Sequence, residues 1–154
     1  MGAFQTVAEI TVTLIGFVGI FLAFSAERAK ASRSDLVDFL VSAMGATAFA
    51  FLPLVLSGVV AEQTLWRLSC GLFGFFHLGI WAWAIRAHLA VRLFSLVEWF
   101  FLAASLLVIA LKLAVGGGYF VSWGYQIYLL GLVWLILNCI LGFYGFMARA
   151  LWEE

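Results

Sequence analysis

Long hydrophobic stretches separated by short polar breaks are the dominant pattern along this chain. A helix that crosses a bilayer needs about 20 mostly apolar residues, and five segments reach that length, at about 4–26, 36–60, 65–85, 93–115 and 125–148. The breaks between them are too short to hold a soluble domain. The pattern therefore predicts one all-α membrane domain over residues 1–154. It would be a bundle of five transmembrane helices, or of four if the first segment lies along the interface.

The composition supports a chain that lives in lipid. Of its 154 residues, 66% are hydrophobic and 10% are charged, whereas soluble domains are about 45–50% apolar and about 25% charged. We therefore expect the lipid bilayer as its main partner, in a membrane of the bacterial inner (plasma) type. The formal net charge is zero, which gives no basic footprint for nucleic acid.

The basic residues predict an orientation, because cytoplasmic loops of membrane proteins are enriched in Lys and Arg. If the N-terminus is outside and the C-terminus is cytoplasmic, six of the eight basic residues fall on the cytoplasmic side: Arg28, Lys30, Arg33, Arg86, Arg92 and Arg149. Only Arg67 and Lys112 fall on the outer side. The group Arg28, Lys30 and Arg33 could also receive a cytosolic partner protein.

Polar and small residues of the first segment recur at helical spacing. Ionisable residues cost roughly 2.5–3.5 kcal/mol at the membrane centre on insertion scales, so they usually face water or other helices. One face of the helix would carry Thr6, Glu9, Thr13 and Gly16, followed by Ala23 and Glu27. The opposite face would carry Ile10, Leu14, Phe17, Phe21 and Phe24, which suit lipid.

Three environments are open to the Glu9 carboxylate. It could reach water at the nearby helix end, or pair with Lys112, which the predicted topology puts on the same side. It could also line a wet cavity together with Thr6 and Thr13. The threonines on the same face favour the cavity, because a side chain that merely reaches for water needs no such neighbours.

Four further polar residues fall in or near the predicted spans. His77, near the middle of the third, suits either a hydrogen-bonded core residue or a proton relay. Glu98 would form a shallow ion pair near the cytoplasmic interface, and Lys112 is the possible partner of Glu9. Asn138 would bond to a neighbouring helix or to a ligand.

Small residues and one proline bear on how the helices pack. Glycines such as Gly74 and Gly131 are expected to allow close approach of neighbouring helices. Pro53 lies inside the second span, where proline bends a helix, and it would be either a static bend or a gating hinge. The run Gly116–Gly118 predicts a turn.

The chain shows no signature of an enzyme. It has no nucleophile elbow, no zinc-protease motif and no paired acidic motif. Cys70 and Cys139 are far apart in apolar runs and are expected to be core residues, so we predict no metal site. We predict no cofactor either.

The pair Ala8–Glu9, early in the first helix of a small membrane protein, resembles the small multidrug exporters. That resemblance covers only these few residues, and the five predicted spans and the strong orientation bias depart from the family pattern. It implies that Glu9 would couple protons to the export of a small molecule.

Taken together, the polar and small residues of these segments predict a small cyclic homo-oligomer that forms a membrane channel or pore, most simply an ion channel that a partner protein could gate. Glu9 from each subunit would form an acidic ring, and such rings favour cations. The alternatives are an accessory subunit of a larger membrane complex and a proton-coupled exporter that uses Glu9.

Overall fold

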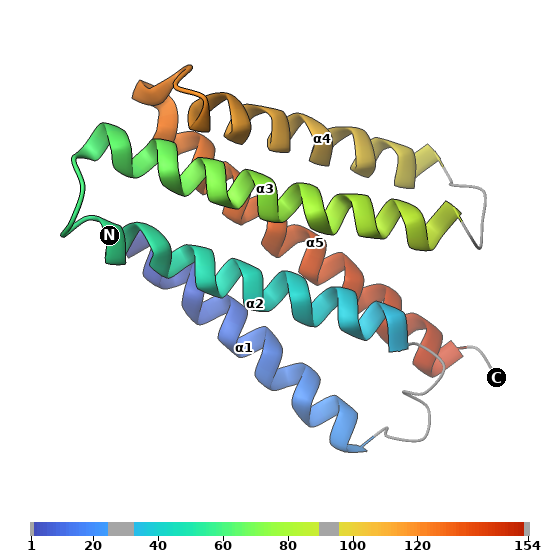
Figure 1. The fold of residues 1–154 in the computed structure, drawn as a ribbon. Helices are drawn as coiled ribbons and strands as arrows, with labels where there is room; N and C mark the ends of the chain where they lie inside the picture. The colour runs from blue at the N-terminus through green and yellow to red at the C-terminus, as the bar shows by residue number, and fades with distance from the viewer. Residues whose placement is uncertain (1, 25–32, 90–95, 153–154) are drawn as a thin grey trace. The chain divides into compact units, whose positions relative to one another are not determined.

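The computed structural model describes residues 2–24, 33–89 and 96–152, and this part of the chain consists of helices joined by short turns (Figure 1). The helices are α1 (Gly2–Phe24), α2 (Arg33–Leu56), α3 (Glu62–Leu89), α4 (Leu96–Gly116) and α5 (Gly124–Trp152). A short 3-10 helix, η2 (Val121–Trp123), precedes α5. Five helices were predicted, and each lies within a few residues of its predicted segment.

Four of these helices are long and apolar enough to cross a membrane. The candidate spans among the described residues are Phe39–Leu56, Glu62–Arg86, Trp99–Gly116 and Val121–Tyr144. They confirm the second to fifth predicted segments as membrane-length helices. The first segment is also helical, as α1, and its crossing of the membrane stays a prediction, as does the orientation of the chain.

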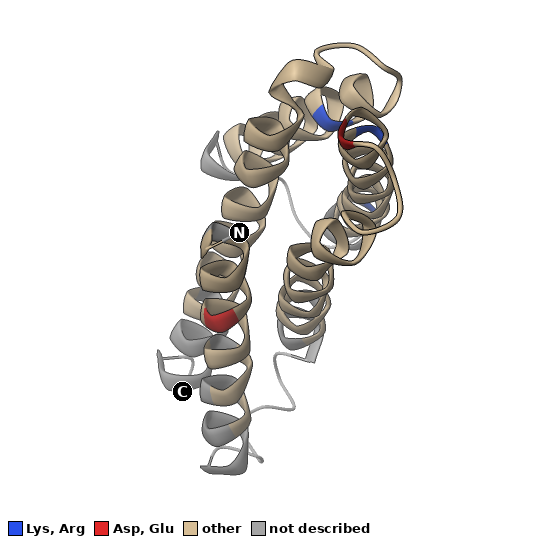
Figure 2. Cartoon of the chain, turned by 90° about the vertical axis from the view of Figure 1, so that its left-hand side faces the viewer, with Lys and Arg blue, Asp and Glu red and all other residues tan. Residues whose placement is uncertain are grey.

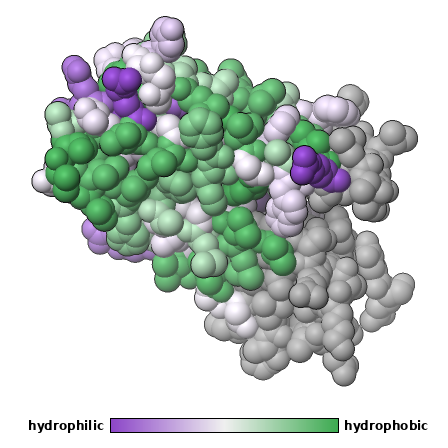
Figure 3. Space-filling model, in the orientation of Figure 1, coloured by the Kyte–Doolittle hydropathy of each residue, from purple (hydrophilic) through white to green (hydrophobic). Residues whose placement is uncertain are grey.

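The surface of the described residues is largely apolar, as contact with lipid requires. Hydrophobic side chains cover most of the coloured part of the face shown in Figure 3, and acidic and basic residues are sparse along the described helices (Figure 2). Phe75 on α3 is 68% exposed and Leu107 on α4 is 62% exposed. Soluble proteins rarely expose large continuous apolar patches. We conclude that the protein is integral to a membrane and contacts the bilayer.

The chain divides into two compact units, to which α2 and α5 both contribute. Unit 1 comprises Met1–Phe51 and Leu135–Glu154, and unit 2 comprises Leu52–Trp134. In unit 1 a buried cluster joins Phe39 and Ala43 of α2 to Cys139 of α5. The ring of Phe39 also meets that of Phe143, with centroids 6.0 Å apart.

Unit 2 is assembled around glycines that let helices approach closely. α3 packs along α4 (Figure 1). A Cβ built on Gly116 would lie 2.8 Å from the Cα of Gly71, and one built on Gly74 would lie 2.8 Å from Leu113 Cδ2. Real Cβ atoms are essentially never that close to another heavy atom, so a larger side chain at Gly116 would push the backbone of α3 away, and one at Gly74 would displace the Leu113 side chain. The predicted packing role of Gly74 is confirmed.

The end of α4 is closed by a glycine turn at the predicted Gly116–Gly118 run. The backbone N–H of Gly117 donates to Leu113 O at 2.8 Å, and that of Tyr119 donates to Ala114 O at 2.9 Å. These bonds satisfy carbonyls left open at the helix end. Gly118 has a φ of 97°, a conformation that glycine adopts without strain.

Two further features follow the sequence expectations. Pro53 is buried inside α2, and the helical pattern continues beyond it through the bond from Ser57 N–H to Pro53 O at 2.9 Å. Its role as a hinge stays a prediction. Both cysteines are free and buried, Cys139 in unit 1 and Cys70 in unit 2, which confirms them as core residues.

Candidate functional site

The polar residues predicted on one face of α1 are exposed in unit 1. Every member of the predicted set lies exposed: Thr6, Glu9, Thr13 and Gly16. The residues that α1 buries are different ones: Phe4, Val7, Ala8 and Thr11. We call the exposed set the Glu9 face. Ile10 and Val12 of α1 are exposed as well, at 41% and 56%, so the Glu9 face is the polar part of a wider uncovered side.

Within the Glu9 face, the threonine hydroxyls are satisfied by their own helix and the carboxylate is not. Thr6 donates to Gly2 O at 3.1 Å, and Thr13 donates to Glu9 O at 2.7 Å. The Glu9 carboxylate accepts one bond from a described residue, from the Gln5 amide at 2.9 Å. A carboxylate has about four acceptor positions, so most of its hydrogen-bonding capacity points away from the rest of the described chain.

Gln5 was not singled out from the sequence, although a general rule predicts its position. Residues four apart lie next to each other on a helix surface, and Gln with an acidic residue is a favourable pair at that spacing. Gln5 and Glu9 meet this rule. The amide therefore belongs to the Glu9 face and fixes one carboxylate oxygen.

Thr11 has a structural role that the sequence analysis did not assign. Its side chain is fully buried, and its Oγ1 lies 2.7 Å from Thr47 Oγ1 of α2. Thr47 also bonds to Ala43 O at 2.9 Å. This pair of hydroxyls ties α1 to α2 inside unit 1, on the side of α1 opposite to Glu9.

The second polar feature is a buried basic pair in unit 2. Lys112 of α4 is fully buried, and its Nζ lies 2.7 Å from Nδ1 of His77, which is 4% exposed on α3. The same Nζ lies 3.6 Å from the centre of the Phe73 ring. Phe73 and His77 are neighbours on one face of α3, with ring centroids 6.2 Å apart. The structure thus brings two predicted candidates, His77 and Lys112, together.

The recorded partners of Lys112 among the described residues are the His77 imidazole and the Phe73 ring, and neither is an acidic group. A protonated Lys112 donates to the Nδ1 lone pair of His77, which places the imidazole proton on Nε2. The negative face of the Phe73 ring supplies further attraction. Lys112 therefore has partners in its own unit, and the alternative that it pairs with Glu9 stays a prediction.

A glycine on α5 makes room for the lysine. A Cβ built on Gly131 would lie 3.0 Å from Lys112 Cδ and 3.0 Å from Phe73 Cε1. The fully buried Tyr128 meets Phe73 edge-on, with centroids 5.3 Å apart. The predicted packing role of Gly131 is therefore specific, because it accommodates the stem of a buried lysine.

Two tryptophans add polar links to unit 2. The Trp134 indole N–H donates to Ser105 Oγ at 2.9 Å, and that of Trp81 donates to Leu102 O at 3.1 Å. Asn138 is half-buried on α5 in unit 1. The two predicted roles of Asn138, a hydrogen bond to a neighbouring helix and a bond to a ligand, both stay predictions.

Part of the predicted site lies outside the described residues. Arg28 and Lys30 of the proposed partner-docking loop belong to this group, and so do the side chains of Arg33 and Glu98. Among the described residues, His, Cys, Asp and Glu nowhere gather in a group of three that could hold a metal ion.

No protein-family model, no curated protein and no solved structure matches this chain. The function is therefore inferred from the residues of the chain itself. Ionisable side chains within apolar helices are costly, and two places among the described residues where they occur are the exposed Glu9 face of unit 1 and the buried Lys112–His77 pair of unit 2.

Proposed function

We propose that the protein is a small homo-oligomeric membrane pore in which the Glu9 face of α1 lies toward the axis of a ring of identical subunits. One observation carries the proposal: the polar and small residues of α1 are left exposed, while Phe4, Val7 and Ala8 are buried. Ile10 and Val12 beside this face are exposed too, but a helix side that meets only lipid would not carry an ionisable carboxylate. The exposed face needs either water or another protein surface beside it.

The energetics favour a wet environment for Glu9. An acidic side chain facing lipid costs up to roughly 2.5–3.5 kcal/mol, and a single amide bond from Gln5 does not remove that cost. A water-filled axis hydrates the carboxylate without moving it from its place on α1. The repetition of one carboxylate around the axis gives an acidic ring, which attracts cations.

The same face contains features that suit close subunit packing. A Cβ built on Gly16 or on Gly19 would meet nothing within 4 Å, so neither glycine is in close packing with the described part of the chain. Small residues let helices from different subunits approach closely. Closed cyclic symmetry is the default for identical subunits. Gating by a cytosolic partner that docks at Arg28, Lys30 and Arg33 belongs to the same proposal.

Single-channel recording of the purified full chain in planar bilayers tests the pore. We expect cation-selective conductance, reduced selectivity in Glu9→Gln, and retained selectivity in the matched variant Glu9→Asp, which keeps the charge. If protein that is folded and inserted conducts nothing, or if Glu9→Gln conducts with unchanged selectivity, the proposed role of Glu9 is wrong.

The oligomeric state separates the pore from the accessory-subunit alternative. Native mass spectrometry from detergent should show a discrete homo-oligomer if the Glu9 face meets copies of itself. A monomer that is unstable alone would instead indicate that another polypeptide covers this face. pH-dependent binding of a small molecule, lost in Glu9→Gln, would indicate the proton-coupled exporter.

A further inference from the structure

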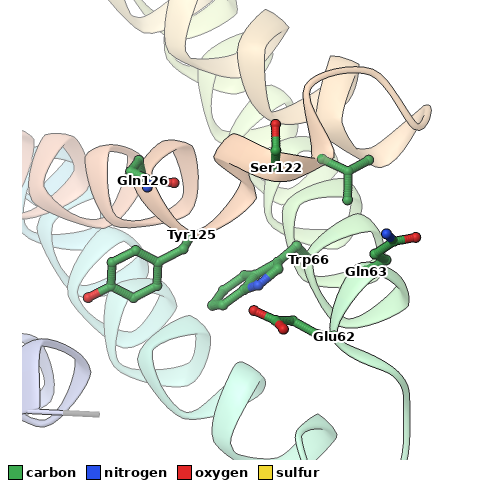
Figure 4. Close-up of a pocket in the computed structure, with 7 residues that line it drawn as sticks. Glu62, Gln63, Trp66, Ser122, Tyr125 and Gln126 are labelled. Atoms are coloured by element: carbon green, nitrogen blue, oxygen red, sulfur yellow. The ribbon is translucent and has the colours of Figure 1, made fainter.

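A pocket of about 300 Å³ opens at the end of unit 2 where α3 and α5 begin. Its wall is made by residues of the first turns of α3 and of the η2–α5 segment: Glu62, Gln63, Trp66, Val121, Ser122, Tyr125 and Gln126. Figure 4 shows the Glu62 carboxylate on the side of the Trp66 indole, with the Tyr125 ring on the far side of that indole. The pocket lies within unit 2 and uses none of the α1 residues on which the pore proposal depends.

The position of the pocket along the helices puts it at a membrane boundary. The candidate spans of α3 and α5 start at Glu62 and at Val121, and both of these residues line the pocket. Trp and Tyr are enriched at the level of lipid headgroups. The pocket is therefore accessible both to solutes in water and to the headgroups of neighbouring lipids.

Its lining carries one charge and two aromatic rings. Glu62 is exposed and is the only ionisable acid or base among the lining residues, apart from the Tyr125 phenol. The rings of Trp66 and Tyr125 meet edge to face, with centroids 5.5 Å apart and an interplanar angle of 79°. The carboxylate and the Tyr125 ring flank the Trp66 indole and all three line the pocket (Figure 4), so a cation held over the indole has an ionic partner on one side and an aromatic surface on the other. The same carboxylate repels anions.

The chemistry favours an organic cation over an inorganic one. A metal ion would need several oxygen ligands, and no group of three acidic, histidine or cysteine side chains is present among the described residues. An alkylated ammonium group is weakly hydrated and is well suited to aromatic walls. The volume of about 300 Å³ is at the lower end of ligand sites, which suits a group of the size of choline.

We propose that this pocket binds an alkylammonium group, with Glu62 as the ionic partner and with Trp66 and Tyr125 as aromatic walls. The group belongs either to a free organic cation or to the headgroup of a choline lipid, because the recognised chemistry is the same. The amides of Gln63 and Gln126 complete the rim. A neutral polyol would use rings and amides as well, but its binding would not depend on the charge of Glu62.

Equilibrium dialysis of radiolabelled choline against the full chain, purified in a detergent without ammonium groups, tests the site. We expect saturable binding that weakens about tenfold in Glu62→Gln, because one partly exposed ionic contact is lost. Glu62→Asp keeps the charge and should bind within a few-fold of the natural chain. Tyr125→Leu should weaken binding, and Tyr125→Phe should retain it.

Two bilayer compositions distinguish the sources of the ligand. In nanodiscs of phosphatidylglycerol, free choline should bind as in detergent. In nanodiscs of phosphatidylcholine, binding of free choline should fall if the lipid headgroup occupies the pocket, and should stay the same if a free cation is the ligand.

Clear results would overturn the site. The site is excluded if choline binding fails to saturate in detergent and also fails to saturate in phosphatidylglycerol nanodiscs. It is excluded as well if Glu62→Gln binds choline as tightly as the natural chain. If Glu62→Gln fails to fold, the half-exposed Tyr125 provides the decisive variant, since equal binding by Tyr125→Leu and Tyr125→Phe also excludes the aromatic wall. Loss of choline binding would leave the conductance test of Glu9 unaffected, so failures of the two proposals are distinguishable.

Discussion

Unit 1 and unit 2 each hold an ionisable side chain in an apolar helix, and they treat it in opposite ways. Glu9 in unit 1 is exposed and has one described partner, the Gln5 amide. Lys112 in unit 2 is fully buried and has both the His77 imidazole and the Phe73 ring within contact distance. The hydrogen bonds and ring contacts around Lys112 come from its own unit, whereas most of the acceptor capacity of Glu9 is left to its surroundings.

This difference predicts that Lys112 matters for the stability of the fold and that Glu9 matters for function. A buried charge depends strongly on its partners, because removing one of them leaves the charge uncompensated in a low-dielectric interior. An exposed charge in an apolar helix contributes little to the fold and matters for whatever lies beside it. We therefore expect substitutions around Lys112 to change the stability of the chain, and substitutions around Glu9 to change assembly or conduction.

The largest expected effect comes from removing the imidazole while keeping the lysine. His77→Leu should lower the free energy of unfolding by about 3 kcal/mol, because Lys112 loses its hydrogen-bonding partner inside unit 2. Lys112→Met removes the charge itself and should cost less, about 1 kcal/mol. Thermal unfolding of the detergent-purified variants measures both.

The double variant sharpens this prediction. His77→Leu combined with Lys112→Met should be more stable than His77→Leu alone, since no uncompensated charge remains. A double variant whose losses simply add, or a Lys112→Met chain less stable than His77→Leu, would show that the pair is not the reason for the cost.

Two glycines offer the next comparison. Gly131→Ala should destabilise the chain by about 1–3 kcal/mol, because the added methyl meets the Lys112 stem and the Phe73 ring at 3.0 Å. Gly16→Ala has open space around it and should leave the unfolding of the solubilised monomer unchanged. If the Glu9 face packs between subunits, however, Gly16→Ala should weaken the oligomer seen by native mass spectrometry. Equal unfolding temperatures for the two variants would contradict the role of Gly131.

The two sides of α1 can be compared through their threonines. Thr11→Val should cost about 0.6 kcal/mol, because it removes the interhelical bond to Thr47, and such bonds in membrane proteins average that value. Thr13→Val removes only a bond within its own helix and should cost less. Unfolding by a denaturing detergent gives the difference, and a larger loss in Thr13→Val would reverse the assignment of buried and exposed sides.

The smallest expected effect on stability is that of Glu9→Gln. The glutamine keeps a carbonyl oxygen for the Gln5 amide, so the unfolding temperature in detergent should stay within about 1 °C of that of the natural chain. A large loss of monomer stability would show that Glu9 has a structural partner and would remove the basis for assigning it to a pore.

The sequence was sufficient for the helices and for the faces of single helices. Hydrophobic segments of membrane length place helices because their backbone groups must be satisfied internally in lipid. Helical periodicity grouped Thr6, Glu9 and Thr13 correctly, since spacing by threes and fours defines a face. The close packing at Gly74 and Gly131 also followed from residue type alone.

The contacts between helices did not follow from the sequence. His77 and Lys112 lie 35 residues apart, and periodicity within one helix says nothing about its register against another. Both residues were candidates, but Lys112 was considered with Glu9 and not with His77. Thr11 was missed for the same reason, because its significance depends on Thr47 of α2.

The two buried cysteines allow the local opening of each unit to be measured by thiol labelling. Cys139 reports on unit 1 and Cys70 on unit 2, and both thiols are free. A thiol-reactive label reaches each one only when its surroundings open, so two labelling rates measure the two local opening free energies separately. In the folded protein, a cysteine introduced at an exposed position of α1 would react first, which allows the Glu9 face to be mapped without removing either native thiol.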